Sequence, residues 1–204
     1  SMLLANVDAF LAGRPVPTPV PESEAVYSAV AVRCKPVTMR VTVDHAETYI
    51  YTGSRALASA QPSVMFVHGA AHDHSVWALQ SRYFAHHGFN ALAVDLRGHG
   101  RSAGAPLPGV DAIADWLVRV LDAVAVQRAV LVGHSMGALA ALACAPRHGP
   151  RVSKLALLGP AVPMGVSDAL LDAARTDDHR AFELINGWSH SAGKQLGGNQ
   201  VPGV

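Results

Sequence analysis

The chain has few cysteines, almost no net charge and no long apolar run, and each absence excludes a class of protein. Its 204 residues contain two cysteines, Cys34 and Cys144, which are too few and too far apart for a disulfide framework or a zinc-binding cysteine cluster. The net charge of +1 gives no electrostatic reason to expect nucleic acid or an anionic membrane as a partner. No apolar run approaches the roughly 18 residues that span a bilayer. We therefore expect a cytoplasmic protein with no nucleic-acid partner and no membrane partner.

The eleven histidines show no metal-ligand spacing. No pair of them combines helical spacing with the acidic partner of a zinc site, and His86 and His87 are adjacent, so on a helix they point in different directions. Cys144 lies among alanines, where a small buried hydrophobic residue is a better interpretation than a reactive thiol. We expect no metal and no organic cofactor.

Apolar strand patterns alternate with helical patterns along most of the chain. Half of the residues are hydrophobic and 15% are charged, which is typical of an α/β protein with a buried sheet. Segments 40–43 and 48–52 can pair as a hairpin. We expect further strands at 63–67, 90–94, 129–133 and 154–158 and helices at 79–88, 109–124 and 136–148. The alternation of strands and helices predicts a mostly parallel sheet flanked by helices. Because parallel strands are joined by right-handed crossovers, the carboxyl ends of the strands should lie at one edge of the sheet.

The most informative motif is Gly133-x-Ser135-x-Gly137, which stands between a strand pattern and an alanine-rich helical pattern. This context is that of a nucleophile elbow, a turn so tight that bulky neighbours of the serine would collide with the adjoining strand and helix. The N–H of Met136 would lie at the helix N-terminus, where negative charge is favoured, and would form half of an oxyanion hole. A flexible glycine turn is the alternative interpretation.

Two upstream segments complete the pattern. The first strand ends at His68-Gly69, so the amide of Ala70 can point toward the serine and supply the second oxyanion donor. The next strand runs into a loop that holds Asp95 and His99. These two residues could be metal ligands or members of a catalytic triad, but we favour a structural loop held by the charges of Asp95 and Arg97.

In this order the three segments, over residues 39–165, resemble the α/β-hydrolase fold family. The resemblance implies that Ser135 is the nucleophile, that the Ala70 and Met136 amides form the oxyanion hole, and that a helical cap begins near Ala161. It also implies a triad whose acid and histidine follow the serine in the chain. A serine at position 135 argues against the dehalogenases and epoxide hydrolases of similar fold, which place aspartate there.

The end of the chain does not supply that acid and histidine. Two further strand–helix units would need about 60 residues, and 46 residues follow Leu158. They read as two helices, one capped by Ser167 and one by Asp177 or Asp178, and a glycine-rich tail. We therefore expect the fold to be truncated before its last strands, with the triad acid and histidine not on this chain. The rest of the domain would come from another polypeptide, or the chain would form a homo-oligomer.

A triad that uses histidines of the cap is the alternative. His179 and His190 lie in this part of the chain near several aspartates, but their spacing does not promise a base within hydrogen-bond reach of the serine.

Three regions follow from these expectations. Residues 1–38 form an N-terminal extension whose proline-rich part should be extended polyproline, residues 39–160 form the core, and residues 161–204 begin the cap.

The predicted activity is that of a serine hydrolase acting on an ester or related acyl compound, with a small molecule as its partner. His72, Trp77 and Met164 are the candidate residues of the substrate pocket. The alternative is a non-catalytic or truncated scaffold that binds a small ligand or a partner. Without the missing acid and histidine, we expect this chain alone to be weak or inactive.

Overall fold

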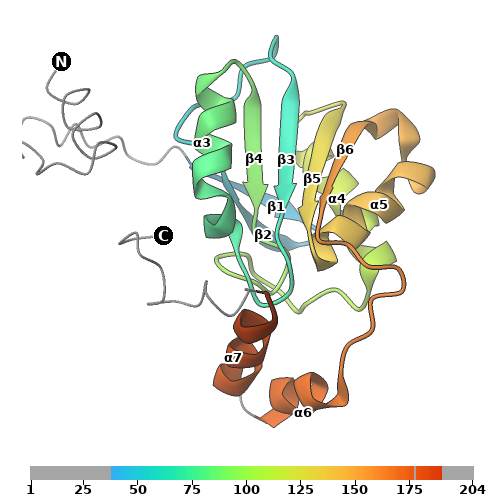
Figure 1. Ribbon diagram of the computed structural model, residues 1–204. Coiled ribbons are helices and arrows are strands. Elements are labelled where there is room, and N and C mark those ends of the chain that lie inside the picture. Colours follow the sequence, from blue (N-terminus) through green and yellow to red (C-terminus); the bar gives the residue numbers. More distant parts are fainter. Residues whose placement is uncertain (1–37, 177, 190–204) are drawn as a thin grey trace, which may run out of the picture. The chain divides into compact units, whose positions relative to one another are not determined.

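The computed structural model describes residues 38–176 and 178–189, which contain a six-stranded sheet (Figure 1). Its strands are β1 (Thr38–Val43), β2 (Ala46–Tyr51), β3 (Ser63–Val67), β4 (Asn90–Val94), β5 (Ala129–His134) and β6 (Val152–Leu158). The strand order is β1-β2-β4-β3-β5-β6. Strands β4, β3, β5 and β6 run parallel, and the hairpin β1–β2 joins β4 in the antiparallel sense. The expected mostly parallel α/β sheet is confirmed, and the expected extension before residue 38 lies outside the described residues.

The parallel strands lie where the apolar runs predicted them. Strands β3 and β4 have the predicted bounds, and every residue in both is buried, as expected for central parallel strands covered on both faces. Strand β5 is one residue longer than predicted and β6 begins two residues earlier. The hairpin was placed less well, because β2 begins at Ala46 rather than at Thr48. Its turn needs only Asp44 and His45, whose φ angles of 49° and 63° match a two-residue hairpin turn.

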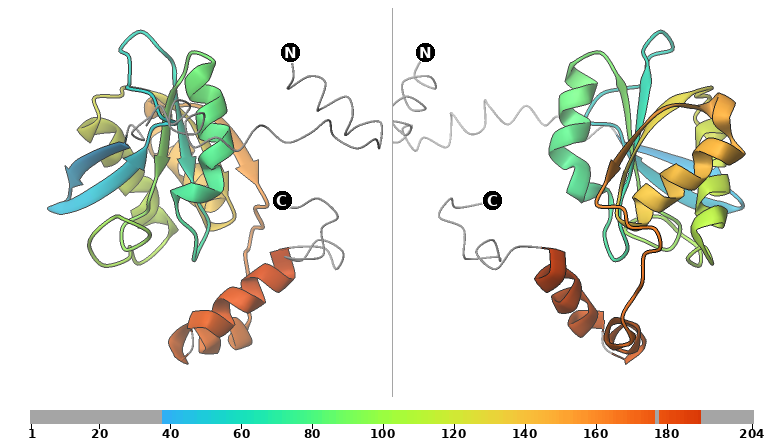
Figure 2. Two further views of the ribbon diagram at one scale, coloured as in Figure 1. Left: turned by 90° about the vertical axis from the view of Figure 1, so that its left-hand side faces the viewer. Right: turned by 45° about the vertical axis from the view of Figure 1, so that its right-hand side comes forward.

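Helices cover both faces of the sheet (Figures 1 and 2). The short 3-10 helix η1 (His74–Trp77) and α3 (Ala78–His86) lie on one face, and α4 (Val110–Ala123) and α5 (Met136–Arg147) lie on the other, followed by the 3-10 turn η2 (Gly149–Arg151). On the α4–α5 side, Trp116 and Leu117 pack with Leu131 in the larger apolar cluster. On the α3 side, Phe66 and Trp77 belong to the smaller one. The three predicted helices are confirmed.

The segment after β6 contains two further helices, α6 (Asp168–Thr176) and α7 (Asp178–Ser189), as predicted. The hydroxyl oxygen of Ser167 accepts a hydrogen bond from the N–H of Leu170 at 3.2 Å, so the predicted cap of α6 is confirmed. Asp177, one of the two residues predicted to cap α7, lies outside the described residues. Within residues 38–176 and 178–189, no helix is both long and apolar enough to cross a lipid bilayer.

Ser102 ties the loop after β4 to strand β2. Its buried hydroxyl donates to the carbonyl oxygen of Asp95 at 2.7 Å and accepts from the N–H of Tyr49 at 2.9 Å. The N–H of Ala103 donates to the carbonyl oxygen of Glu47 at 2.8 Å. The loop is thereby fixed along the strand, which agrees with the structural role predicted for it.

The Ser102→Ala variant should lose about 1–3 kcal/mol of unfolding free energy, because it leaves two buried main-chain groups without their partner. Urea unfolding followed by circular dichroism measures this loss. The exposed Ser59 offers a matched control, and Ser59→Ala should stay within about 0.5 kcal/mol of wild type. Equal stability of the two variants would contradict the role given to the Ser102 hydroxyl.

Candidate active site

The turn between β5 and α5 holds Ser135 in a strained backbone conformation, with φ 53° and ψ −120°. For a residue other than glycine, such a conformation costs on the order of 1–3 kcal/mol and persists only where the surroundings enforce it. Here the N–H of Ser135 donates to the carbonyl oxygen of Leu158 at 2.9 Å, and the Ser135 carbonyl oxygen accepts from the N–H of Ala138 at 2.9 Å. The side chain makes no hydrogen bond to cap the helix, so the hydroxyl has no part in holding the turn.

Both glycines of the motif lie where a side chain has no space. A Cβ atom at Gly133 would lie 2.3 Å from the carbonyl oxygen of Gly137. A Cβ atom at Gly137 would lie 2.4 Å from the carbonyl oxygen of Val67 and 2.5 Å from that of His68. The predicted collision with the adjoining strand and helix is therefore confirmed, and it includes the neighbouring strand β3.

The His-Gly loop after β3 lies against this turn. A Cβ atom built on Gly69 would lie 3.2 Å from the Cβ of Ser135 and 3.2 Å from Nδ1 of His134. Gly69 and Ser135 are therefore neighbours, and the predicted oxyanion donors, the amides of Ala70 and Met136, belong to the residues that follow them in the chain. Met136 is the first residue of α5, so its N–H has no acceptor within the helix. The hydrogen bonds of the described loop segments do not use the Ala70 N–H.

His68 joins the ends of β3 and β4. It is completely buried; its Nδ1 lies 2.8 Å from the carbonyl oxygen of Gly69, and its Nε2 accepts from the N–H of Leu96 at 3.0 Å. A neutral ring with the proton on Nδ1 satisfies both contacts. Burial lowers the pKa of His68 to about 4, so the ring is neutral at neutral pH. The sequence pattern did not predict this role of His68, and its position directly before Gly69 at the end of a strand was the only indication of it.

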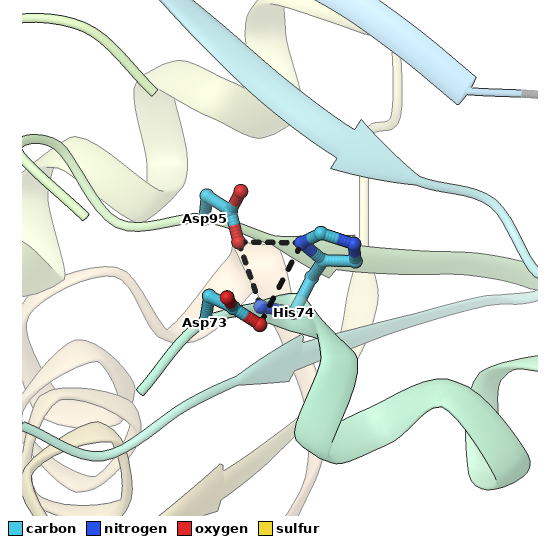
Figure 3. A group of neighbouring side chains, drawn as sticks. All are labelled: Asp73, His74 and Asp95. Atoms are coloured by element: carbon cyan, nitrogen blue, oxygen red, sulfur yellow. Dashed lines mark hydrogen bonds and ion pairs between the residues drawn. The ribbon is translucent and has the colours of Figure 1, made fainter. Parts of the chain in front are cut away.

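Asp95 is fully buried and is held by the residues around it (Figure 3). Its Oδ1 accepts from the N–H of His74 at 2.6 Å and lies 2.8 Å from Nδ1 of the same residue, while Oδ2 accepts from the N–H of Arg101 at 2.8 Å. The predicted structural role of Asp95 is thus supported, but not the part given to Arg97. Nε of Arg97 is buried without a hydrogen-bond partner among the described residues, and the carboxylate is held by His74 and a backbone amide instead.

Asp73 completes a group of three possible metal ligands with His74 and Asp95. Asp73 Oδ1 accepts from the N–H of Ser75 at 2.7 Å, and this hydrogen bond caps η1. The pKa of Asp73 is lowered: burial acts in the opposite direction, but the Ser75 hydrogen bonds and the nearby His74 outweigh it. Since both carboxylates already accept hydrogen bonds from the protein, the group is explained without a metal.

The three residues predicted to line the substrate pocket lie in different surroundings. His72 lines a cavity of about 260 Å³ with Ala71, Phe182 and Ile185. The Oγ of Ser135 donates to the Sδ of Met164 at 4.0 Å, a weak contact that brings Met164 to the serine. Met164 thus lies beside Ser135, and His72 lies beside His134, the residue before it.

Trp77, also predicted to line the pocket, is a core residue in the described part of the chain, which does not support that prediction. It is 5% exposed and packs its ring against Phe66, with 5.4 Å between the ring centroids, in the core beneath α3. Trp77 ends the helix η1, and its side chain packs with Val64 and Phe66 of β3.

No histidine or carboxylate makes a hydrogen bond with the Ser135 hydroxyl in residues 38–176 and 178–189, where Met164 is its partner. The ring of His134 lies 5.9 Å from that of His72, centroid to centroid, and its pKa is lowered by burial and by the charge that His72 can carry. His179, considered above as a replacement base, is 84% exposed and pairs with Glu183 at 3.5 Å. His190 lies outside the described residues.

The Gly137→Ala variant should lose at least about 3 kcal/mol of unfolding free energy, because its methyl group would press on backbone atoms of β3. Thermal or urea unfolding measures this loss. Gly187 is a helical control: it is exposed, and among the described residues no atom lies within 4 Å of where its Cβ would be. Gly187→Ala should be neutral or gain up to about 1 kcal/mol from helix propensity alone. A tolerated Gly137→Ala would refute the close approach.

The low pKa of His68 predicts a loss of stability in mild acid. In the unfolded chain the His68 ring takes up a proton near pH 6.5. In the folded protein it does so only near pH 4. The unfolding free energy therefore falls as the pH drops from about 6.5 to about 4. His68→Gln keeps an amide donor and acceptor but does not titrate. Between about pH 7 and about pH 4.5, wild type should lose about 2 kcal/mol more than the variant in urea unfolding. Parallel pH profiles would show that His68 is not buried as a neutral ring.

The comparisons with known proteins agree with this geometry. The family model described as alpha/beta hydrolase fold matches residues 62–196. An epoxide hydrolase of Caballeronia sordidicola is 35% identical over 62% of this chain and 40% of its own length. The lipase LipV of Mycobacterium tuberculosis is 32% identical over 64% of this chain and 53% of its own length. The solved structure of Est816, described as an N-acyl homoserine lactone degrading enzyme, has a TM-score of 0.64 and 27% identity over 76% of this chain and 58% of that one.

The matched part of the chain thus spans about half or less of these curated relatives. The family model nevertheless covers most of the described sheet together with both glycines around Ser135. The chain therefore belongs to the α/β-hydrolase fold family.

Proposed function

We propose that this chain carries the nucleophile and the oxyanion-binding groups of a serine hydrolase that acts on an ester or a related acyl compound. The observation that carries the proposal is the strained backbone of Ser135 at the N-terminus of α5. A serine whose backbone is strained and whose hydroxyl does no structural work has no reason to be held there unless the hydroxyl reacts.

In the proposed reaction, Oγ of Ser135 attacks the carbonyl carbon of the substrate and gives its proton to a general base. The negative charge that develops on the carbonyl oxygen accepts hydrogen bonds from the amides of Ala70 and Met136, and the dipole of α5 favours this charge. The leaving group departs with a proton, and water then releases the acyl group from Ser135. The general base has to come from outside the residues that contact Ser135 in the described part of the chain.

The names of the similar proteins favour an acyl substrate over the alternatives. Two similar proteins, a lipase and an enzyme that degrades N-acyl homoserine lactones, have names that indicate acyl substrates. Each of them matches more than half of this chain. The matched epoxide hydrolase has a name that indicates a different bond. The residue at position 135 is a serine, which the resemblance associates with acyl transfer through an ester intermediate.

A non-catalytic scaffold is the second candidate. It is favoured by the weak partner of the Ser135 hydroxyl, which is a thioether rather than an imidazole in the described residues. A nucleophile without a base keeps the oxyanion hole but gains only a small part of the usual rate enhancement.

A fluorophosphonate probe separates the two candidates. Ser135 Oγ would form a bond to phosphorus as fluoride leaves, and the serine proton passes to base or solvent. Because no base contacts the Ser135 hydroxyl among the described residues, we expect slow labelling. At long incubation it should give one mass increase per chain, located by peptide mapping on the fragment that contains Ser135. Ser135→Ala should remove the labelling entirely.

The exposed Ser59 again provides the control, and Ser59→Ala should label at the wild-type rate. An absence of labelling in a folded wild-type protein would overturn the catalytic proposal for this chain and leave the binding scaffold. Labelling that persists in Ser135→Ala would assign the reactive group to another residue.

A further inference from the structure

An apolar groove of about 440 Å³ lies beside α5, between this helix and the segment that follows β6. The ten residues that line it share an apolar side chain: Val110, Leu139, Leu142, Ala143, Ala145, Pro146, Ala161, Val162, Pro163 and Met164. The groove is open to solvent, since Leu142 is 39% exposed and Val162 is 75% exposed. Exposed apolar surfaces that are continuous in this way mark binding sites.

Helix α5 lines the groove with a single row of side chains, which we call the stripe. Leu139, Leu142, Ala143 and Pro146 are spaced by three, four and seven residues and therefore share one face of the helix. At 1.5 Å per residue, this stripe is about 10 Å long. An extended chain of single bonds advances about 3.3–3.6 Å for every three bonds, so about eight bonds would cover the stripe. An alkyl chain of about eight carbons has this number of bonds when the bond to its carbonyl carbon is included.

Met164 connects the groove to the nucleophile. It lines the groove, and its Sδ is the atom that contacts the Oγ of Ser135 at 4.0 Å. Ser135 directly precedes α5, so the helix face that carries the stripe begins one turn after the serine. The groove and the atom that we assign to nucleophilic attack are therefore separated by one side chain, that of Met164.

We propose that the groove binds an alkyl chain of about eight carbons, the acyl part of a substrate whose carbonyl group lies at Ser135. The inference rests on the proposed function for the head group, but the groove supplies the chain-length preference by itself. Its lining offers no polar side chain to a sugar, a phosphate or a charged group, whereas an alkyl chain needs none. The volume lies within the range of small-molecule sites, and the flexible thioether of Met164 can move aside as the chain enters.

Two fluorophosphonates, one with an ethyl and one with an octyl chain, test the preference through their rates of labelling Ser135. We expect the octyl probe to react at least about tenfold faster than the ethyl probe in wild type, because methylene groups leave water when they enter the groove. Leu142→Gln introduces a polar group of similar size on a partly exposed helix position. It should reduce the octyl-to-ethyl ratio about fivefold, because the octyl chain would lose an apolar neighbour in the groove.

Leu79→Gln is the matched control. Leu79 is 79% exposed on α3, away from the groove, and the substitution removes the same amount of apolar side chain. Its octyl-to-ethyl ratio should equal that of wild type. If both probes label Ser135 and Leu142→Gln leaves the ratio unchanged, the groove proposal is wrong although the hydrolase proposal stands.

A titration of octanol into the Ser135→Ala variant tests the groove without any reaction at the serine. The methyl resonances of Leu139, Leu142 and Val162 should shift in saturable fashion, and those of Leu79 should not. If neither probe labels wild type, the hydrolase proposal fails, and the titration alone decides whether the groove binds alkyl chains. Unchanged groove resonances would overturn the inference. A concentration-dependent dimer that Leu142→Gln abolishes would overturn it too, because the groove would then be an interface between two copies.

Discussion

The close approach of helix α5 to strand β3 is the constraint on which the rest of this site depends. The backbone of Gly137 lies so near the carbonyl oxygens of Val67 and His68 that even a methyl group would overlap them. Without this approach the helix would stand off from the sheet, and Ser135 would lose its place beside Gly69. Two backbones can meet in this way only where one of them lacks a side chain, so the positions of the glycines follow from packing as much as from chemistry.

At the same edge of the sheet, His68 and Asp95 have their buried polar atoms hydrogen-bonded. The neutral ring of His68 spans from Gly69 to Leu96, and the buried carboxylate of Asp95 accepts from His74 and Arg101. These contacts join the ends of neighbouring strands at a cost that full hydrogen bonding offsets. Through Gly69, which the His68 ring contacts, these groups reach the turn at Ser135 without using the serine side chain.

The sequence predicted those features that depend on local pattern. Two short runs, apolar after their first residue, located β3 and β4 to the residue. The glycines around Ser135 predicted the turn together with its steric reason. The predictions that the structure does not support concern the direction of side chains after a turn. Trp77 and Arg97 follow irregular segments, where no periodicity states which way a residue points, and the sequence does not show that η1 turns Trp77 into the core.

Ser135 and Asp95 differ in how their polar groups are held at this edge. Asp95 is fully buried, and both of its carboxylate oxygens accept hydrogen bonds. These hydrogen bonds offset the free-energy cost of removing the carboxylate from water. Ser135 differs in both respects. Its backbone is strained, and its hydroxyl makes only a weak contact with Met164, which does not offset the free energy of the strain. Stability alone does not explain such a residue. Because Met164 also lines the apolar groove, the uncompensated hydroxyl and the exposed apolar surface meet at one side chain, which is the arrangement that an acyl substrate would require.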